Sequence, residues 1–166
     1  MKNINLRELE ETSRLLVKLL KDKGLKIATA ESCTGGMVSG AITAVAGSSA
    51  VFDGGLCAYS NGVKRSLLGV PESTLETVGA VSAATAVYMA RGALKLFGAD
   101  VAVSVTGIAG PDGGSDEKPV GTVYIALATK YHSVVMHHRF SGDRHNVRVK
   151  SALSALGLAL ETIAEL

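Results

Sequence analysis

Aromatic side chains are scarce in this chain, which contains no tryptophan and only 4% aromatic residues among 166. A core without large rings must be filled by alanine, valine, leucine and isoleucine, which suits close packing of helices on a sheet. A strong charge imbalance is also missing, since the formal net charge is only +2. Binding to nucleic-acid phosphates requires a concentrated basic patch, and the mildly basic segment 130–148 does not supply one. We therefore expect no nucleic-acid partner.

Long apolar runs are absent as well. No stretch approaches the about 18 uninterrupted apolar residues of a membrane span, and the N-terminal residues lack the apolar segment of a secretory signal. The two cysteines, Cys33 and Cys57, lie in apolar segments, where reduced thiols are the ordinary finding in a cytosolic protein. These absences predict a cytoplasmic protein without membrane contact and without a disulfide.

The histidines show neither the His-x-x-x-His nor the Cys-His spacing of a metal site, so we expect no metal. They are also poor candidates for a catalytic base. His137 and His138 are adjacent on an expected strand and point to opposite faces, so at most one of them could serve. His132 begins that strand, and His145 lies at a helix start.

Helical spacing and short β-branched runs alternate along the chain. Helices are expected over residues 5–22, 36–46, 61–68, 71–77, 82–97 and 143–166, and strands over residues 26–30, 51–60, 100–105, 121–129 and 132–140. The last two strands resemble an antiparallel pair, whereas the earlier strands alternate with helices. This order predicts a three-layer α/β/α sandwich with a mixed β-sheet, in a single domain over residues 1–166.

The most informative segment runs from Lys26 to Gly36, where a β-prone stretch breaks into small polar residues and two glycines. Side chains and free backbone N–H groups converge at the carboxyl end of a sheet strand, and small residues let a ligand approach the backbone. The candidates here are Glu31, Ser32, Cys33 and Thr34. Ser32 and Cys33 cannot both face one pocket if the strand continues through them. Cys33 fits packing better than chemistry, and Ser32 fits a helix cap about as well as a nucleophile.

A catalytic serine needs a partner that takes its proton. Lys64 follows the second strand, on the first turn of an expected helix, from which its side chain could reach the same crevice. A solvated surface lysine is the more ordinary interpretation of such a residue.

A second transition from strand to glycine occurs at Thr106, which is followed by Gly-Ile-Ala-Gly-Pro-Asp-Gly-Gly. Its backbone N–H groups could hold a phosphate or an oxyanion, although the spacing matches neither a Walker loop nor a dinucleotide fingerprint. Arg144 begins the last helix, where its guanidinium could grip a phosphate, or could simply lie at the surface.

Seven motifs together resemble the CinA C-terminal domain family, in order, from about residue 7 to the C-terminus. They are Ala30-Glu-Ser-Cys-Thr-Gly-Gly36, Gly47-Ser-Ser49, Tyr59-Ser-Asn61 with Lys64, Gly79-Ala-Val-Ser82, Thr106-Gly-Ile-Ala-Gly-Pro-Asp-Gly-Gly114, Lys118-Pro-Val-Gly-Thr122 and Phe140-Ser-Gly-Asp-Arg144. The family's enzymes are nicotinamide-nucleotide amidases. The resemblance therefore implies conversion of nicotinamide mononucleotide (NMN) to nicotinic acid mononucleotide and ammonia, in pyridine-nucleotide recycling and without a cofactor.

Carried over by position, the resemblance implies roles for individual residues. Ser32 becomes the nucleophile and Lys64 its base, with Tyr59 and Thr106 as supporting groups at the reacting centre. Candidates for binding the nucleotide substrate are Glu31, Thr34, Gly35, Gly36, Gly107, Gly110 and Arg144.

Two alternatives remain open: a catalytically silent domain that binds nucleotides or proteins, and an acyl hydrolase acting on another amide. Many relatives carry a larger N-terminal domain that this sequence lacks, so a stand-alone form is expected. The Ala-rich and Gly-rich helices leave room for close subunit packing, and we expect a homo-oligomer.

Overall fold

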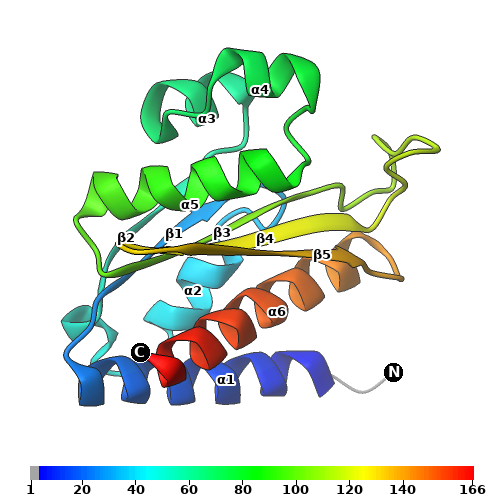
Figure 1. The fold of residues 1–166 in the computed structure, drawn as a ribbon. Coiled ribbons are helices and arrows are strands. Elements are labelled where there is room, and N and C mark those ends of the chain that lie inside the picture. Colours follow the sequence, from blue (N-terminus) through cyan, green and yellow to red (C-terminus); the bar gives the residue numbers. More distant parts are fainter. Residues whose placement is uncertain (1–3) are drawn as a thin grey trace.

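The computed structural model describes residues 4–166, which form one five-stranded sheet with helices on both faces (Figure 1). The strand order across the sheet is β2-β1-β3-β4-β5. The first three strands are mutually parallel, and β4 and β5 are added antiparallel. The strands are β1 (Ile27–Glu31), β2 (Phe52–Cys57), β3 (Val101–Gly107), β4 (Thr122–Thr129) and β5 (Ser133–Arg139).

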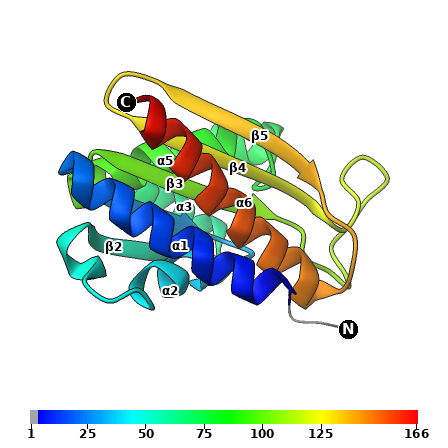
Figure 2. The same cartoon turned by 90° about the horizontal axis from the view of Figure 1, so that it is seen from below.

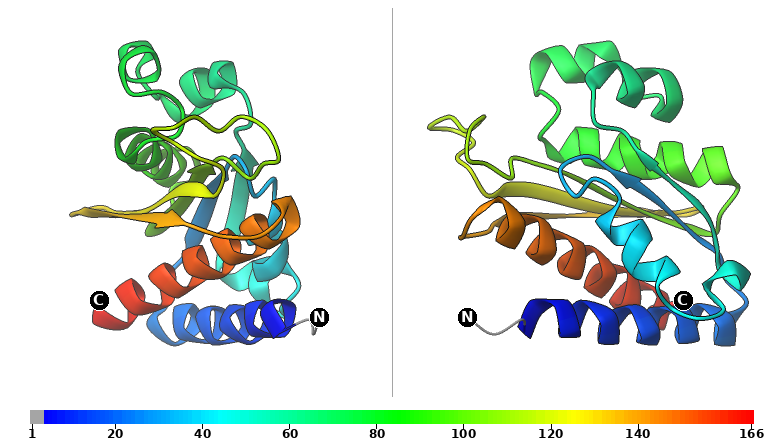
Figure 3. Two further views of the ribbon diagram at one scale, coloured as in Figure 1. Left: turned by 90° about the vertical axis from the view of Figure 1, so that its right-hand side faces the viewer. Right: turned by 180° about the vertical axis from the view of Figure 1, so that it is seen from behind.

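The helices divide between the two faces of the sheet. α5 covers one face, with α3 and α4 lying beyond it, and α1, α2 and α6 cover the other (Figures 1 and 3). The helices are α1 (Ile4–Lys23), α2 (Met37–Thr43), α3 (Asn61–Leu68), α4 (Glu72–Thr77), α5 (Ala83–Phe97) and α6 (Arg144–Glu165). The mixed sheet between two helical layers confirms the predicted α/β/α class. Within the described residues, no helix is long and apolar enough to cross a membrane.

Three helix starts follow from side-chain caps that supply acceptors for free backbone N–H groups. Ser60 caps α3 by accepting from the Val63 N–H, and Ser82 caps α5 by accepting from the Thr85 N–H. Asp143 caps α6 in the same way. The starts of α3 and α6 are therefore fixed locally, and these two helices carry Lys64 and Arg144.

The core confirms the expectation of small and branched side chains. β1 is buried along its whole length, as is β3 apart from its last residue, which explains their continuous apolar sequences. On the α5 side the packing is built largely from alanines, among them Ala86, Ala90 and Ala93. On the other side α1 and α6 lie next to each other across the sheet (Figure 2).

Most element boundaries agree with the sequence prediction to within two residues, and two of them differ by three. The strand expected to reach residue 60 ends at Cys57, and the helix expected over 36–46 spans only Met37–Thr43. Gly47 then adopts a left-handed backbone and begins a short 3-10 turn, Ser48–Ala50 (η1), that the sequence pattern does not predict. Residues 1–3 of the predicted domain lie outside the described residues.

Candidate active site

The order of the strands brings Ser32 and Lys64 to one place. Ser32 directly follows β1, and its N–H donates to the Val105 carbonyl of β3 at 2.9 Å. Lys64 lies on α3, which follows β2 after a short connection. Since β2, β1 and β3 are parallel neighbours, the segments that follow them emerge at the same edge of the sheet.

Lys64 contacts the serine directly. Its Nζ lies 3.1 Å from Ser32 Oγ, and it donates to the carbonyls of Ala58, at 2.8 Å, and Tyr59, at 3.1 Å. The lysine is only 1% exposed, so this amine is withdrawn from water. A solvated surface lysine, the ordinary alternative, does not occur here.

Burial is the main cause that lowers the pKa of Lys64, because the charged form loses its hydration. Within residues 4–166, no carboxylate lies at ion-pair distance from this amine to restore the charged form. A neutral amine has two N–H bonds and one lone pair. A neutral amine whose two hydrogens point to the carbonyls of Ala58 and Tyr59 would direct its lone pair at the hydroxyl of Ser32, as a general base must.

Cys33 is a packing residue, as the sequence indicates. It belongs to the apolar cluster beneath the sheet, and burial raises the pKa of its thiol to about 11. The thiol therefore stays protonated and unreactive near neutral pH. Because β1 ends at Glu31, the alternation of a continuing strand does not apply, and Ser32 and Cys33 both border the cavity described next. Cys33 and Cys57 are unpaired.

A cavity of about 270 Å³ opens in front of the serine. It is lined by seven residues named from the sequence: Ser32, Tyr59, Lys64, Thr106, Gly107, Gly110 and Arg144. The rest of the lining lies within the quoted motifs but received no individual role from the sequence; besides Cys33 it consists of Asn61, Ala80, Val81, Ile108, Ala109, Asp112 and Gly113. The structure thus gathers residues from four separate parts of the chain around one serine.

Hydrogen bonds between distant segments hold the cavity walls together. The buried Thr106 hydroxyl donates to the Ala80 carbonyl at 2.7 Å, which ties β3 to the segment before α5. The Arg144 guanidinium donates to the Gly110 carbonyl at 2.8 Å and to the Tyr59 hydroxyl at 3.1 Å. Arg144 therefore bridges two walls of the cavity.

Glu31, Thr34, Gly35 and Gly36 were expected at the substrate, but they do not line the cavity. The Glu31 carboxylate is buried and accepts from the backbone N–H groups of Gly36, Val38 and Ser39 at the start of α2, at 2.8 to 3.1 Å. Gly35 and Gly36 have φ angles of +59° and +92°, which residues with a Cβ rarely adopt. These residues shape the turn after Ser32.

Arg148 is the residue that sequence reasoning missed. It lies one helical turn after Arg144 on α6 and donates to the carbonyls of Cys33, at 3.1 Å, and Thr34, at 2.8 Å. Residues four apart share a helix face, so the spacing from Arg144 is the signal that could have found it. Arg148 holds in place the turn that begins with Ser32.

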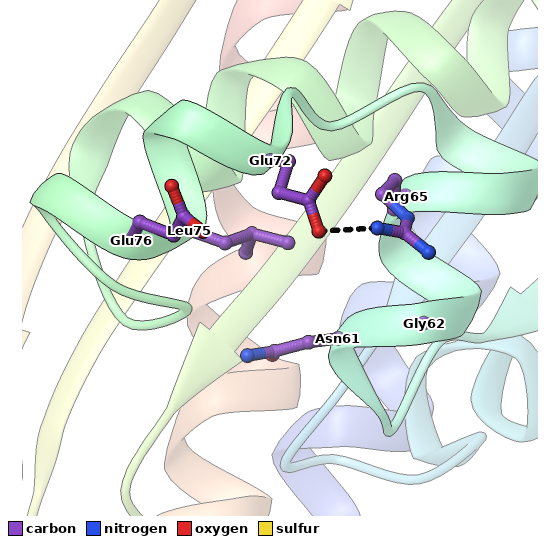
Figure 4. Close-up of a pocket in the computed structure, with 6 residues that line it drawn as sticks. All are labelled: Asn61, Gly62, Arg65, Glu72, Leu75 and Glu76. Atoms are coloured by element: carbon purple, nitrogen blue, oxygen red, sulfur yellow. Dashed lines mark hydrogen bonds and ion pairs between the residues drawn. The ribbon is translucent and has the colours of Figure 1, made fainter.

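A second pocket, of about 260 Å³, lies between α3 and α4 (Figure 4). Arg65 and Glu72 form an ion pair there, and Asn61 borders both this pocket and the cavity at Ser32. Both charged side chains are more than half exposed, so the pair contributes little to stability. The pocket has no nucleophile with a neighbouring base.

Comparison with known protein families gives a match to the CinA C-terminal domain over residues 9–163. The chain is 54% identical over 155 residues to nicotinamide-nucleotide amidohydrolase PncC of Enterobacter agglomerans, covering 93% of this chain and 94% of that protein. It is 55% identical over 141 residues to a CinA-like protein of Geobacter sulfurreducens, covering 85% of this chain. The chain spans only 34% of that longer relative.

Solved structures agree with this assignment. The competence/damage inducible protein from Agrobacterium tumefaciens has a TM-score of 0.92 at 45% identity, over 95% of this chain and 96% of that one. A CinA superfamily protein from Klebsiella pneumoniae has the same TM-score at 35% identity, over 95% of this chain and 99% of that one.

Proposed function

Because the chain belongs to the CinA C-terminal domain family, we propose that it is a nicotinamide-nucleotide amidohydrolase that uses Ser32 as nucleophile and Lys64 as base. The substrate would be NMN, and the products nicotinic acid mononucleotide and ammonia. The observation that carries the proposal is the 3.1 Å contact between Lys64 Nζ and Ser32 Oγ. A relative that is 54% identical over nearly its whole length and named as such an amidohydrolase supports the choice of substrate.

In the first half of the reaction, neutral Lys64 accepts the Ser32 proton while Oγ attacks the carboxamide carbon. The resulting oxyanion requires hydrogen-bond donors, and our candidate is the N–H of Cys33, which donates to no backbone carbonyl within residues 4–166. The tetrahedral intermediate then collapses. The C–N bond breaks, the Lys64 ammonium returns its proton to the nitrogen, and ammonia leaves a Ser32 ester.

In the second half, a water molecule attacks the ester carbon and Lys64 accepts its proton. The bond to Ser32 Oγ breaks, and the serine recovers a proton from Lys64. The carboxylic acid product is released, and both residues return to their starting states. The same short contact thus serves both halves, and no redox step or cofactor is part of the proposal.

Charges in the cavity fit a nucleotide with a cationic ring. Arg144 uses two of its N–H groups on Gly110 and Tyr59, which leaves three of the five guanidinium donors for a phosphate. The Asp112 carboxylate also borders the cavity and could face the pyridinium of NMN. We assign Thr106, Gly107 and Tyr59 to the walls that position the ring.

The predicted substrate-binding residues that lie outside the cavity receive an indirect role in this proposal. Glu31 fixes the start of α2 through its carboxylate, and Gly35 and Gly36 permit the turn that presents Ser32. Thr34 accepts from Arg148 through its carbonyl. We place the activity in the cytoplasm, a setting consistent with the two unpaired cysteines.

The direct test is release of ammonia from NMN without added metal. Ser32→Ala and Lys64→Ala should each lower kcat by a factor on the order of 1,000 or more, because the nucleophile or its base is lost. Thr43→Ala, an exposed change on α2 away from the cavity, is the matched control and should retain activity. Full turnover by either site variant would contradict the assigned roles.

The two remaining alternatives give different results in the same assay. A silent binding domain would bind NMN and release no ammonia. An acyl hydrolase that needs no phosphate would hydrolyse free nicotinamide at about the same rate as the mononucleotide. A phosphate contact at Arg144 instead predicts that the free base is a far poorer substrate.

A further inference from the structure

The edge strand β5 has an unusual composition for a strand with one side open. It is the last strand of the sheet, and it lies along the margin of the molecule with no helix across its outer side (Figure 2). Its sequence is Ser-Val-Val-Met-His-His-Arg, and its register with β4 is continuous. Edge strands usually carry lysine, proline, an inward charge or a bulge that prevents pairing with another chain. β5 has one exposed charged residue, Arg139, at its end, but no lysine, proline, inward charge or bulge.

The opposite edge of the same sheet is protected in the usual way. β2 carries Asp53 and two consecutive glycines, Gly54 and Gly55. Its pairing with β1 is interrupted by a register shift between Ile27 and Ala28. The two edges therefore differ, and of the two only β5 pairs with its neighbour in a continuous register.

Two backbone bonds establish which groups of β5 point outward. Thr129 N–H donates to His132 O at 2.9 Å, and Phe140 N–H donates to Gly121 O at 2.9 Å. These bonds flank the ladder at both ends, and in an antiparallel ladder the hydrogen-bonded residues alternate. Even-numbered residues thus direct their N–H and C=O groups to β4. The outward groups belong to Ser133, Val135, His137 and Arg139.

The side chains at this edge also lack cover. Val135 is 40% exposed and Met136 is 38% exposed, on opposite faces of the sheet. Arg91 of α5 donates to Ser133 at 3.0 Å, which fixes α5 alongside β5. Tyr88, 40% exposed, lies one turn earlier on the same helix face. Apolar surface therefore flanks the outward backbone groups.

The strand is complementary to itself. In an antiparallel pair related by a two-fold axis at Met136, Val135 lies opposite His137 of the second copy, and Ser133 lies opposite Arg139. All four residues present outward groups, so every outward N–H and C=O finds a partner in this one register. The two Met136 side chains meet at the axis, and no like charges are opposed.

We propose that β5 is the surface through which two copies of this chain associate, antiparallel and two-fold symmetric, to form one continuous sheet. The second copy is favoured over another protein because the pairing residues come from the same strand and match in one register. This surface is independent of the proposed amidase activity, since none of its residues borders the cavity at Ser32.

The test is the mass of the protein in solution by light scattering, at concentrations up to about 100 μM. The wild type should have twice the 17.0 kDa mass of one chain. Val135→Lys should raise the dissociation constant at least about tenfold, because symmetry places the new charge twice in one small interface. Leu15→Lys, at an apolar residue of α1 that is 57% exposed, is the matched control and should remain dimeric.

Amide hydrogen exchange of the wild type provides a measurement that does not depend on a folded variant. The outward amides of Val135 and His137 should exchange slowly at high protein concentration and rapidly on dilution. A single-chain mass for the wild type would overturn the proposal. So would a dimer that is unaffected by Val135→Lys, or outward amides that exchange rapidly at every concentration.

Discussion

The buried amine of Lys64 affects both the stability of the fold and the chemistry proposed for the site. Its burial without a carboxylate partner costs stability, and the two carbonyls that accept from it offset only part of that cost. The same burial lowers the pKa of the lysine and so makes the neutral base available nearer to physiological pH. Burial of Lys64 therefore lowers the stability of the fold and, by the same desolvation, favours the neutral amine that the proposed mechanism requires.

The pH dependence of catalysis should follow this lysine. Since the proposed base acts in its neutral form, kcat/KM should rise about tenfold per pH unit below the pKa of Lys64 and level off above it. The rise should end below the ordinary lysine value of 10.5, because burial lowers the pKa. A profile of ammonia release against pH measures this, and a rise that continues through pH 10.5 would contradict a buried neutral base.

The lowered pKa of Lys64 also makes the free energy of unfolding depend on pH. Between the lowered folded pKa and the unfolded value of 10.5, the unfolded chain binds more protons, so the free energy of unfolding should rise with pH across that window. The cost of burying Lys64 is complete below the folded pKa and gone above 10.5. Lys64→Met should remove this part of the slope in denaturant unfolding measured at several pH values.

Glu31 shows what the sequence could not reveal at the scale of one residue. An acid beside a nucleophile suggests chemistry, and a helix cap is normally sought at the N-cap position itself. The N-cap of α2 is Gly36, which has no side chain, and Glu31 supplies the carboxylate from the end of β1. Only the fold of the turn shows that the acid serves the helix.

At the scale of elements, the contact between α3 and α5 depends on a glycine. A Cβ on Gly92 would lie 2.7 Å from the carbonyl carbon of Leu68 and overlap its oxygen. Gly92→Ala must therefore move α3 relative to α5, which we expect to disturb the contact between Lys64 and Ser32. We expect a loss of about 1–3 kcal/mol in unfolding free energy and a drop in kcat on the order of tenfold to a hundredfold.

Gly157 on α6 is the matched control for this change. No atom lies within 4 Å of a Cβ built there, so Gly157→Ala should stabilise the protein by about 0.5–1 kcal/mol and leave activity unchanged. Denaturant unfolding and ammonia release measure both variants. Equal activity in Gly92→Ala and the wild type would show that α3 need not lie so close to α5.

Most elements could be predicted because their sequence patterns are strong. The leucines of α1 repeat with helical spacing, Ser82 and Gly98 mark the ends of α5, and β3 is a continuous apolar run. The turn Ser48–Ala50 is three residues long, too short to show a period. β2 ends at Cys57 and not at residue 60, although Ala58 still donates to the Glu31 carbonyl beyond the end of the regular strand.

At the scale of the whole molecule, the cavity joins segments that only the sheet topology brings together. A ligand that touches β1, α3, the loop after β3 and α6 should stabilise the entire fold. With the inactive Ser32→Ala variant, NMN at about 100 times its Kd should add about 2.7 kcal/mol, a rise in Tm on the order of 5–10 °C.

Nicotinamide without its phosphate serves as the control ligand for thermal unfolding and should produce a much smaller shift at equal concentration. Adding Arg144→Gln to the Ser32→Ala variant should reduce the shift with NMN toward that of nicotinamide, because the charge-assisted contacts to phosphate are lost. If this double variant gave the full shift in Tm with NMN, the phosphate would have to bind to residues other than Arg144.

The predicted residues that meet at the cavity share a property that the sequence does show, because they lie at the end of a strand, in the segment after one, or in the first turn of a helix. Ser32 follows β1, Thr106 lies near the end of β3, and Arg144 begins α6. Arg148 has no such position, since it lies within α6 and acts on backbone carbonyls, which leave no trace in a sequence. Its spacing of four residues from Arg144 places it on the same helix face, but its contacts with the carbonyls of Cys33 and Thr34 are seen only in the structure.

The two arginines of α6 also set an order of events during protein synthesis. Ser32 and Lys64 are made early, but the turn that presents the serine and the loop at Gly110 are both held by a helix translated more than a hundred residues after the serine. A nascent chain that lacks α6 already contains the proposed nucleophile and base without a finished cavity around them. The ribosome therefore completes the site only with the helix that begins at Arg144.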